Sequence, residues 1–209
     1  MIRSLAAMSL GAVILSGCVT AQQSLAPIDS SNFELDQTHA FLTASVKHFG
    51  ISSYRIDFTD IDGQLDFQAD EPTASSLSFQ VNTAQLATHY PDPEKRADWE
   101  DELANDGRWL NADEFPTATF VSTSATQTGE FTGTVTGDLN LRGVTEPITL
   151  DVTFNGTATS PLDGGKRRVG FDATCTFNRS DFGMGAMTQF VSDEVTLSFS
   201  GEFLEAGDE

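Results

Sequence analysis

Apolar and polar residues alternate with a period of two along most of the chain. Between positions 42 and 47, for example, Leu, Ala and Val alternate with Thr, Ser and Lys. Alternation of this kind is typical of β-strands that bury one face. Comparable runs occur at 54–67, 77–81, 118–122, 131–141, 148–154, 169–177 and 195–203. We therefore predict about eight strands, with a bulge or bend near Gly63, where the phase shifts by one residue.

An apolar face on every strand requires an interior that the strands share. Closure of an antiparallel sheet removes the unpaired edges that favour aggregation. We therefore predict an all-β fold, an antiparallel eight-stranded barrel, which is wide enough to hold one small ligand. Small residues fall on the predicted inward faces at Ala44, Gly63, Gly133, Gly137 and Ala173. The sequence leaves open whether its sixteen Phe fill this space or leave it hollow.

One segment, 91–106, departs from the alternation. It is rich in charged residues, and Trp99 and Leu103 are four positions apart. This spacing fits a short amphipathic helix. We predict a short helical insert that could cap the mouth of the barrel.

The first eighteen residues have the features of a bacterial secretion signal. Arg3 is the only charge before Cys18, and the run 5–15 is almost wholly apolar. This pattern is typical of a signal peptide rather than of a membrane-spanning helix. The run ends in Leu-Ser-Gly-Cys at 15–18, which resembles the lipobox of bacterial lipoproteins. An ordinary secretion signal with a chance Cys is the alternative.

These features divide the chain into three parts. Residues 1–17 are the predicted lipoprotein signal peptide, 18–32 the lipidated Cys18 and a flexible tether, and 33–205 the barrel. Val19 stands where an Asp would favour retention in the inner membrane, by resemblance to known lipoproteins. We expect an envelope protein that faces the periplasm and is anchored through Cys18, in the outer membrane rather than the inner one.

Charge excludes one class of partner. The formal net charge is −20, and binding to nucleic acid requires basic side chains that replace phosphate counterions. We therefore expect no nucleic-acid partner and a solvated acidic surface. With Cys18 used for the anchor, Cys175 is the one thiol left, and we expect it to be buried on an apolar strand face.

Four segments follow one another along the chain: Asp36 with HAFLTASVKHFG at 39–50, FPTATFVS at 115–122, GDLNLRGVTEPI at 137–148, and NRSDFGM at 178–184. Together they resemble the YceI-like family, lipocalin-like barrels associated with binding of polyisoprenoids and other lipids. The resemblance covers about 33–204. The sequence departs from the family pattern near the predicted mouth, at Ala40 and in the segments 91–99 and 107–110. Of the family's properties, the preference for a lipid headgroup is therefore the one that transfers least to this chain.

No motif for catalysis, a metal or a cofactor is present in the sequence. The spacings typical of zinc sites, P-loops, dinucleotide sites and nucleophile elbows are missing. Of His39, His48 and His89, only His48 falls on an apolar strand face. A hydrogen-bonded core position and a ligand contact both remain open for it.

Arg142 and Arg179 are scarce positive charges in predicted turns. Either of them could meet a phosphate or carboxylate headgroup. The alternative is that they stabilise the turns by pairing with Asp138 and Asp181.

We predict a binding protein, not an enzyme, that holds a long isoprenoid or fatty-acyl chain in the barrel without a cofactor. The predicted lipid-binding residues share the inward strand faces: Leu42, Ala44, Val46, His48, Ile56, Phe58, Phe79, Phe120, Val135, Leu139, Leu150, Val152, Phe171, Ala173 and Leu197.

Two alternatives remain. One is an envelope structural or interaction module with a filled barrel and no ligand. The other is an enzyme that acts on a lipid headgroup with His48 or Asp181. The sequence does not fix the oligomeric state, and a homodimer is compatible with it.

Overall fold

The computed structural model describes residues 31–159, 161 and 164–207. The predicted signal peptide, Cys18 and most of the predicted tether lie outside the described residues. The strands are β1 (Ser31–His48), β2 (Ser52–Phe58), β3 (Ile61–Phe67), β4 (Ser76–Asn82), β5 (Leu86–Ala87), β6 (Thr117–Gln127), β7 (Thr132–Leu141), β8 (Val144–Thr159), β9 (Arg167–Asn178) and β10 (Val191–Glu205). Ser31 and Asn32, expected in the tether, pair with Phe67 and Asp66 of β3.

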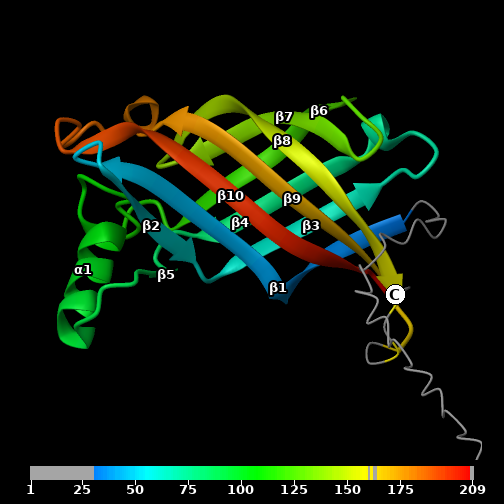
Figure 1. The fold of residues 1–209 in the computed structure, drawn as a ribbon, viewed down its shortest axis with the longest axis horizontal. Coiled ribbons are helices and arrows are strands. Elements are labelled where there is room, and N and C mark those ends of the chain that lie inside the picture. The colour runs from blue at the N-terminus through cyan, green and yellow to red at the C-terminus, as the bar shows by residue number, and fades with distance from the viewer. Residues whose placement is uncertain (1–30, 160, 162–163, 208–209) are drawn as a thin grey trace, which may run out of the picture.

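The strands form one antiparallel sheet that closes on itself. Its order is β10-β9-β8-β7-β6-β4-β3-β1-β2-β5, and an additional pairing joins β10 to β1. The closed ring therefore contains eight strands, while β2 and β5 extend the sheet beyond one end of β3 and β4. The strands cross the barrel obliquely (Figure 1). The predicted eight-stranded antiparallel barrel is confirmed.

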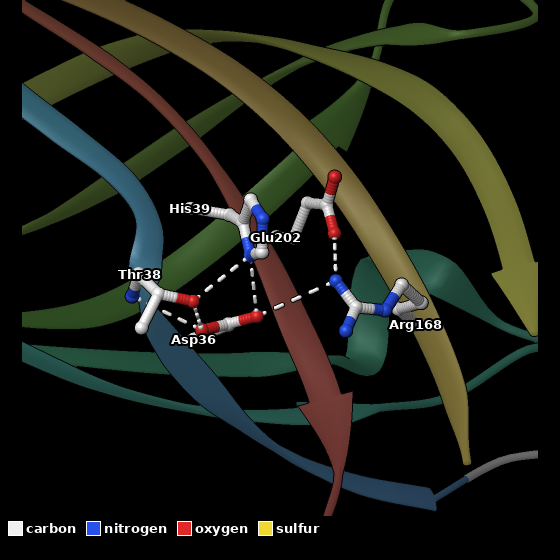
Figure 2. A network of polar contacts seen from close by, with 5 residues as sticks. All are labelled: Asp36, Thr38, His39, Arg168 and Glu202. Atoms are coloured by element: carbon white, nitrogen blue, oxygen red, sulfur yellow. Dashed lines mark hydrogen bonds and ion pairs between the residues drawn. The ribbon is translucent and has the colours of Figure 1, made fainter. Parts of the chain in front are cut away.

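A long bulge divides β1 into two halves. Leu35 pairs with Phe203 and Ala40 with Gly201, so four residues of β1 lie opposite Glu202 alone. The bulge is held by polar contacts of Asp36, which accepts hydrogen bonds from Thr38 and lies 2.8 Å from Nδ1 of His39 (Figure 2). Before the bulge β1 pairs with β3, and after it β1 pairs with β2.

The segment 137–148 contains the end of β7, the turn that follows it and the start of β8. Leu141 pairs with Val144, which leaves Arg142 and Gly143 as a two-residue turn. Both have positive φ, 53° and 73°, as a type I′ turn requires. The guanidinium of Arg142 donates to the carbonyl oxygens of Gly183 and Gly107, each at 3.0 Å. The turn is thereby fixed to two other loops.

Phe rings occupy the space beside several inward glycines. A Cβ added at Gly137 would lie 2.4 Å from Cζ of Phe120, and one at Gly63 would lie 2.7 Å from Cε1 of Phe79. These two glycines therefore make room for aromatic rings rather than for a ligand. Gly133 does line the cavity that is described below.

The predicted helix is present as α1 (Pro93–Asn105), and it begins after Asp92, whose carboxylate accepts from the backbone of Glu94 and Lys95. Its buried residues Leu103 and Ala104 pack with Leu86 of β5. The expectation that the helix caps the barrel mouth is wrong. The helix lies beside β2 and β5, at the end of the barrel opposite the β3–β4 and β6–β7 loops (Figure 1).

Candidate functional site

The barrel encloses a cavity of about 440 Å³, a volume typical of small-molecule sites, which measure roughly 300–1,000 Å³. Its walls come from the inward faces of the ring strands. Val135 on β7, Leu150 and Val152 on β8, Ala173 on β9 and Leu197 on β10 all line it. The alternation of the strands places them there, since every second side chain points inward. The Phe side chains therefore do not fill the barrel.

One end of the cavity is closed by a short 3₁₀ turn, η3 (Arg179–Phe182). Phe182 and Met184 are buried, and they join Leu139, Leu141 and Ile148 in one apolar cluster. Five residues of this cluster also line the cavity: Ala118, Phe120, Leu139, Ile148 and Cys175.

The closing turn depends on Arg179. Arg179 as a whole residue is 4% exposed, and its guanidinium donates to the carbonyl oxygens of Ser192, Met184, Ala186 and Val191. It also lies over the ring of Trp109, 5.6 Å from the centroid. Burial lowers its pKa, because removal from water disfavours the charged form.

Neither turn arginine therefore meets a ligand in the way considered from the sequence. Arg142 and Arg179 both donate to backbone carbonyls, and neither is in the cavity wall. The alternative pairing with Asp138 and Asp181 is also not what the structure contains. The aspartate that stabilises the turn η3 is instead Asp193, whose carboxylate accepts hydrogen bonds from the backbone N–H and the hydroxyl of Ser180.

The other end of the cavity opens between two loops. Pro72 and Thr73 in the 3₁₀ turn η1 (Pro72–Ala74), after β3, line one side. Gln127 and Glu130, at the β6–β7 turn, line the other. All four are exposed, so the cavity reaches solvent here, at the end of the barrel away from α1 (Figure 1).

The structure places ten of the fifteen predicted lipid-binding residues in the cavity wall: Leu42, Phe79, Phe120, Val135, Leu139, Leu150, Val152, Phe171, Ala173 and Leu197. It places the other five elsewhere. Ile56 and Phe58 pack in the cluster beneath α1, because the helix covers this face of β2. Val46 lines a polar groove on the outer surface of the barrel. Ala44 is half-buried and lines neither this groove nor the cavity, and His48 is exposed at the end of β1.

Several wall residues were not predicted, and Ser122 is the most informative of them. Its hydroxyl accepts a hydrogen bond of 2.8 Å from the backbone N–H of Leu77 on β4. It follows Phe120 on the inward face of β6, just before a register shift between Ser122 and Ser124. The alternation 118–122 places it inward, but a Ser gives no apolar signal.

Cys175 is buried, as expected, and it also lines the cavity. Burial raises the pKa of its thiol to about 11. The thiol is therefore protonated at neutral pH and is a weak nucleophile. His48 and Asp181, the candidates for headgroup catalysis, are both exposed and lie outside the cavity wall.

One cluster offers metal-ligand atoms within the described residues. Asp36, His39 and Glu202 bring three such atoms within 4.8 Å of one another. However, Arg168 lies between the two carboxylates, 3.4 Å from Asp36 and hydrogen-bonded to Glu202 (Figure 2). Burial disfavours the ionised form of Asp36, but hydrogen bonds from Thr38 and His39 outweigh it and hold its pKa at about 2. The cluster therefore acts as an ion-pair network that holds the β1 bulge.

No helix in the part of the chain that the structure describes is long and apolar enough to cross a bilayer.

Comparison with known sequences agrees with the geometry. The sequence model of the YceI-like domain matches residues 33–203. A UPF0312 protein of Pseudomonas savastanoi pv. phaseolicola is 37% identical over 204 residues, which cover 95% of this chain and 96% of that protein. A UPF0312 protein of Pseudomonas fluorescens is 34% identical over 200 residues, which cover 93% of this chain and 95% of that protein.

Solved structures share the barrel. The YceI protein of Campylobacter jejuni is 26% identical with a TM-score of 0.65, over 77% of this chain and 90% of that one. Burkholderia cenocepacia BcnA (23% identity, TM-score 0.67, 82% and 99% coverage) is similar in fold. A polyisoprenoid-binding domain from Saccharophagus degradans (13%, 0.59, 85% and 100%) is also similar in fold. The domain match over 33–203 and the identity to the UPF0312 proteins show that this chain belongs to the YceI-like family.

Proposed function

We propose that this protein binds one long isoprenoid or fatty-acyl chain inside the barrel and carries or stores it without chemical change. The observation that supports this most is the cavity of about 440 Å³ with an almost wholly apolar wall. An apolar chain that enters it leaves water, which contributes roughly 25 cal/mol per Å² of surface buried. The fold shared with a polyisoprenoid-binding domain supports the same class of ligand.

The proposed place of action is the bacterial cell envelope. The signal pattern that ends at Cys18 supports acylation of this residue, and Val19 supports the outer membrane. β1 begins at Ser31, so about a dozen residues would join the anchor to the barrel. A tether of this length would let the open end of the barrel reach the membrane surface.

Native mass spectrometry of the full chain, purified without detergent, tests both parts. A bound lipid adds mass under native conditions and is lost on denaturation, whereas an acyl group on Cys18 remains after denaturation. The variant Cys18→Ser should lose the second mass and keep the first. A chain that carries no lipid and takes up neither prenyl nor acyl chains would contradict the carrier role and favour an envelope interaction module.

A further inference from the structure

The polar groove on the outer surface of the barrel has a volume of about 540 Å³, within the range of small-molecule sites, which measure roughly 300–1,000 Å³. It lies over β10, β1 and β2, which are neighbours in the sheet (Figure 1). Leu42 and Leu197 line the cavity inside the barrel, so the alternating neighbours Thr43 and Ser198 face the groove. No described residue lines both spaces. The groove is therefore a second concave site with a wall of its own.

The floor of the groove is rich in hydroxyl groups. On β10, Thr196 is paired with Ser45 of β1, and Ser198 is paired with Thr43. The hydroxyls of Ser45, Thr196 and Ser198 have no hydrogen-bond partner within the described residues. Each of them can both donate and accept a hydrogen bond, so the floor can bind a ligand that also carries many hydroxyls.

Two cations stand beside these hydroxyls, on β1 and β2. Arg55 is paired with Ser45, and Lys47 is paired with Ser53, which makes the two cations diagonal neighbours on one face. Long side chains in such positions can reach one another. Nζ of Lys47 lies 3.0 Å from the hydroxyl of Ser53, and neither cation forms an ion pair in the part of the chain that the structure describes. One anionic group can therefore contact both.

Cations without an acidic partner are unexpected in this protein, because its 31 acidic residues far outnumber its 11 Lys and Arg. Arg108, Arg167 and Arg168 each form an ion pair with an Asp or Glu. Arg55 and Lys47 instead place two like charges side by side. An anion bound between them would relieve their repulsion.

Two carboxylates limit the charge that this anion can carry. Asp57 is already engaged: its Oδ1 accepts from the hydroxyl of Thr43 at 2.6 Å, and its Oδ2 lies 3.2 Å from Nε2 of His89. The carboxylate of Glu194 is exposed on β10 and has no partner among the residues described. A phosphate monoester, with a charge of about −1.5 to −2 at pH 7, would be repelled by both acids. A single carboxylate is repelled less, and a hydroxyl or amide N–H on the same ligand can donate to Glu194.

We propose that this groove binds a saccharide that bears one carboxylate. The carboxylate contacts the ammonium of Lys47 and the guanidinium of Arg55, whose planar donors match it in a bidentate manner. The sugar hydroxyls exchange hydrogen bonds with the free hydroxyls of β1 and β10, and one of them donates to Glu194. The site is separate from the cavity inside the barrel and does not depend on the lipid proposed to bind there.

Three sugars with the same ring test this proposal. N-acetylglucosamine is neutral, N-acetylmuramic acid carries one additional carboxylate, and N-acetylglucosamine 6-phosphate carries a phosphate instead. Titration of the full-length Cys18→Ser chain, followed through backbone amide chemical shifts, gives both the affinity and the place of binding. We expect the sugar acid to bind about tenfold more tightly than the neutral sugar, because hydrogen bonds between charged groups are the stronger ones. The shifts should fall on β10, β1 and β2.

Two variants that each remove one positive charge sharpen the result. Arg55→Gln should abolish the preference for the sugar acid and leave the affinity for N-acetylglucosamine nearly unchanged. Lys95→Gln is the matched control, because Lys95 is exposed on α1 and lies outside the groove, and its affinities should stay within about twofold of the parent values. Far-ultraviolet circular dichroism checks that both variants keep the fold.

Three results would overturn the proposal. The first is equal binding of the acidic and neutral sugars by the parent, or no binding of any of the three. The second is tighter binding of the phosphate than of the sugar acid, which would exclude the assignment of a carboxylate. The third is a set of shifts in the cavity wall that an excess of farnesol suppresses, which would place the sugar inside the barrel.

Discussion

Val135 and Leu150 are directly opposed across the β7–β8 ladder, and both side chains lie in the wall of the cavity. Cross-strand neighbours of this kind are in contact on one face of a sheet. A change in either side chain therefore alters the same part of the cavity, without involving the closing turn or the mouth.

Replacement of Val135 or Leu150 by Glu should abolish lipid uptake. The new carboxylate would project into an apolar space, and an unpaired buried charge is costly. We expect affinity for farnesol to fall by about tenfold or more, measured by titration, with the far-ultraviolet circular dichroism of the barrel retained. Val121→Glu is the matched control, because Val121 is 53% exposed and lies outside the cavity wall. Unchanged uptake in both cavity variants would contradict the assignment of the site.

Arg179→Ala should destabilise the closed end of the barrel. Four carbonyl oxygens, of Ser192, Met184, Ala186 and Val191, would lose their donor. Unsatisfied buried polar groups cost about 1–3 kcal/mol each, so we expect a loss of about 3 kcal/mol or more in the free energy of unfolding, measured with urea.

Two further variants identify the reason for this loss. Arg179→Lys should recover little of it, because an ammonium lacks the planar array of five donors. Arg108→Ala removes two ion pairs between half-exposed side chains, with Glu102 and with Asp106, and exposed pairs contribute about 0–1 kcal/mol each. Equal effects of Arg179→Ala and Arg108→Ala would rule out the bonding role of Arg179.

Gly137→Ala should be destabilising although the change is small. The added methyl would lie 2.4 Å from the ring of Phe120 and 2.5 Å from the carbonyl oxygen of Val121. Forced overpacking of this kind costs about 1–3 kcal/mol. Gly107→Ala is the control, because nothing lies within 4 Å of a Cβ at that position, and its effect should remain within about 0.5 kcal/mol. Urea unfolding of the two variants side by side measures the difference.

The sequence predicted the strands, their closure into a barrel and the helix, because each depends on local periodicity. It predicted less about which neighbour covers each apolar face. Ile56 and Phe58 have the same alternation as Leu150 and Val152, yet α1 covers the first pair and the cavity the second. Alternation states which side chains share a face, but the identity of the covering element is a tertiary property.

The roles of Arg142 and Arg179 were missed for a different reason. Their partners are backbone carbonyls, which every residue type provides. A search for acidic partners along the sequence cannot find such contacts. The one local signal was the Arg-Gly pair at 142–143, whose positive φ angles close the β7–β8 turn.

Acid should weaken the fold between about pH 4.5 and pH 2. The hydrogen bonds from Arg167 hold the pKa of Glu205 at about 2, against an ordinary 4.5, and the pKa of Asp36 is held at about 2 against 3.8. Because both values are lower in the folded state, the ionised groups stabilise it above their ordinary pKa values. This contribution is lost as the pH falls toward 2.

Urea unfolding of the parent, Asp36→Asn and Glu205→Gln at a series of pH values measures this contribution. Each variant should show a shallower loss of stability in this range, since it lacks one of the titrating groups. Asn at 36 can still accept from Thr38 and so preserve the bulge. Identical pH profiles of all three proteins would show that other carboxylates dominate acid unfolding.

Cys175 offers a direct report of cavity occupancy. Its thiol lines the cavity beside Leu197 and has a pKa of about 11, so only about one thiol in a thousand is ionised at pH 8. In the Cys18→Ser protein, iodoacetamide should therefore modify Cys175 slowly. Bound farnesol should slow the reaction further, because its prenyl tail covers the sulfur. Mass spectrometry at timed intervals gives both rates. In urea, where the thiol is exposed, the two samples should react equally fast, which separates protection by the ligand from loss of reagent. A native rate that farnesol leaves unchanged would mean that the ligand lies outside the barrel.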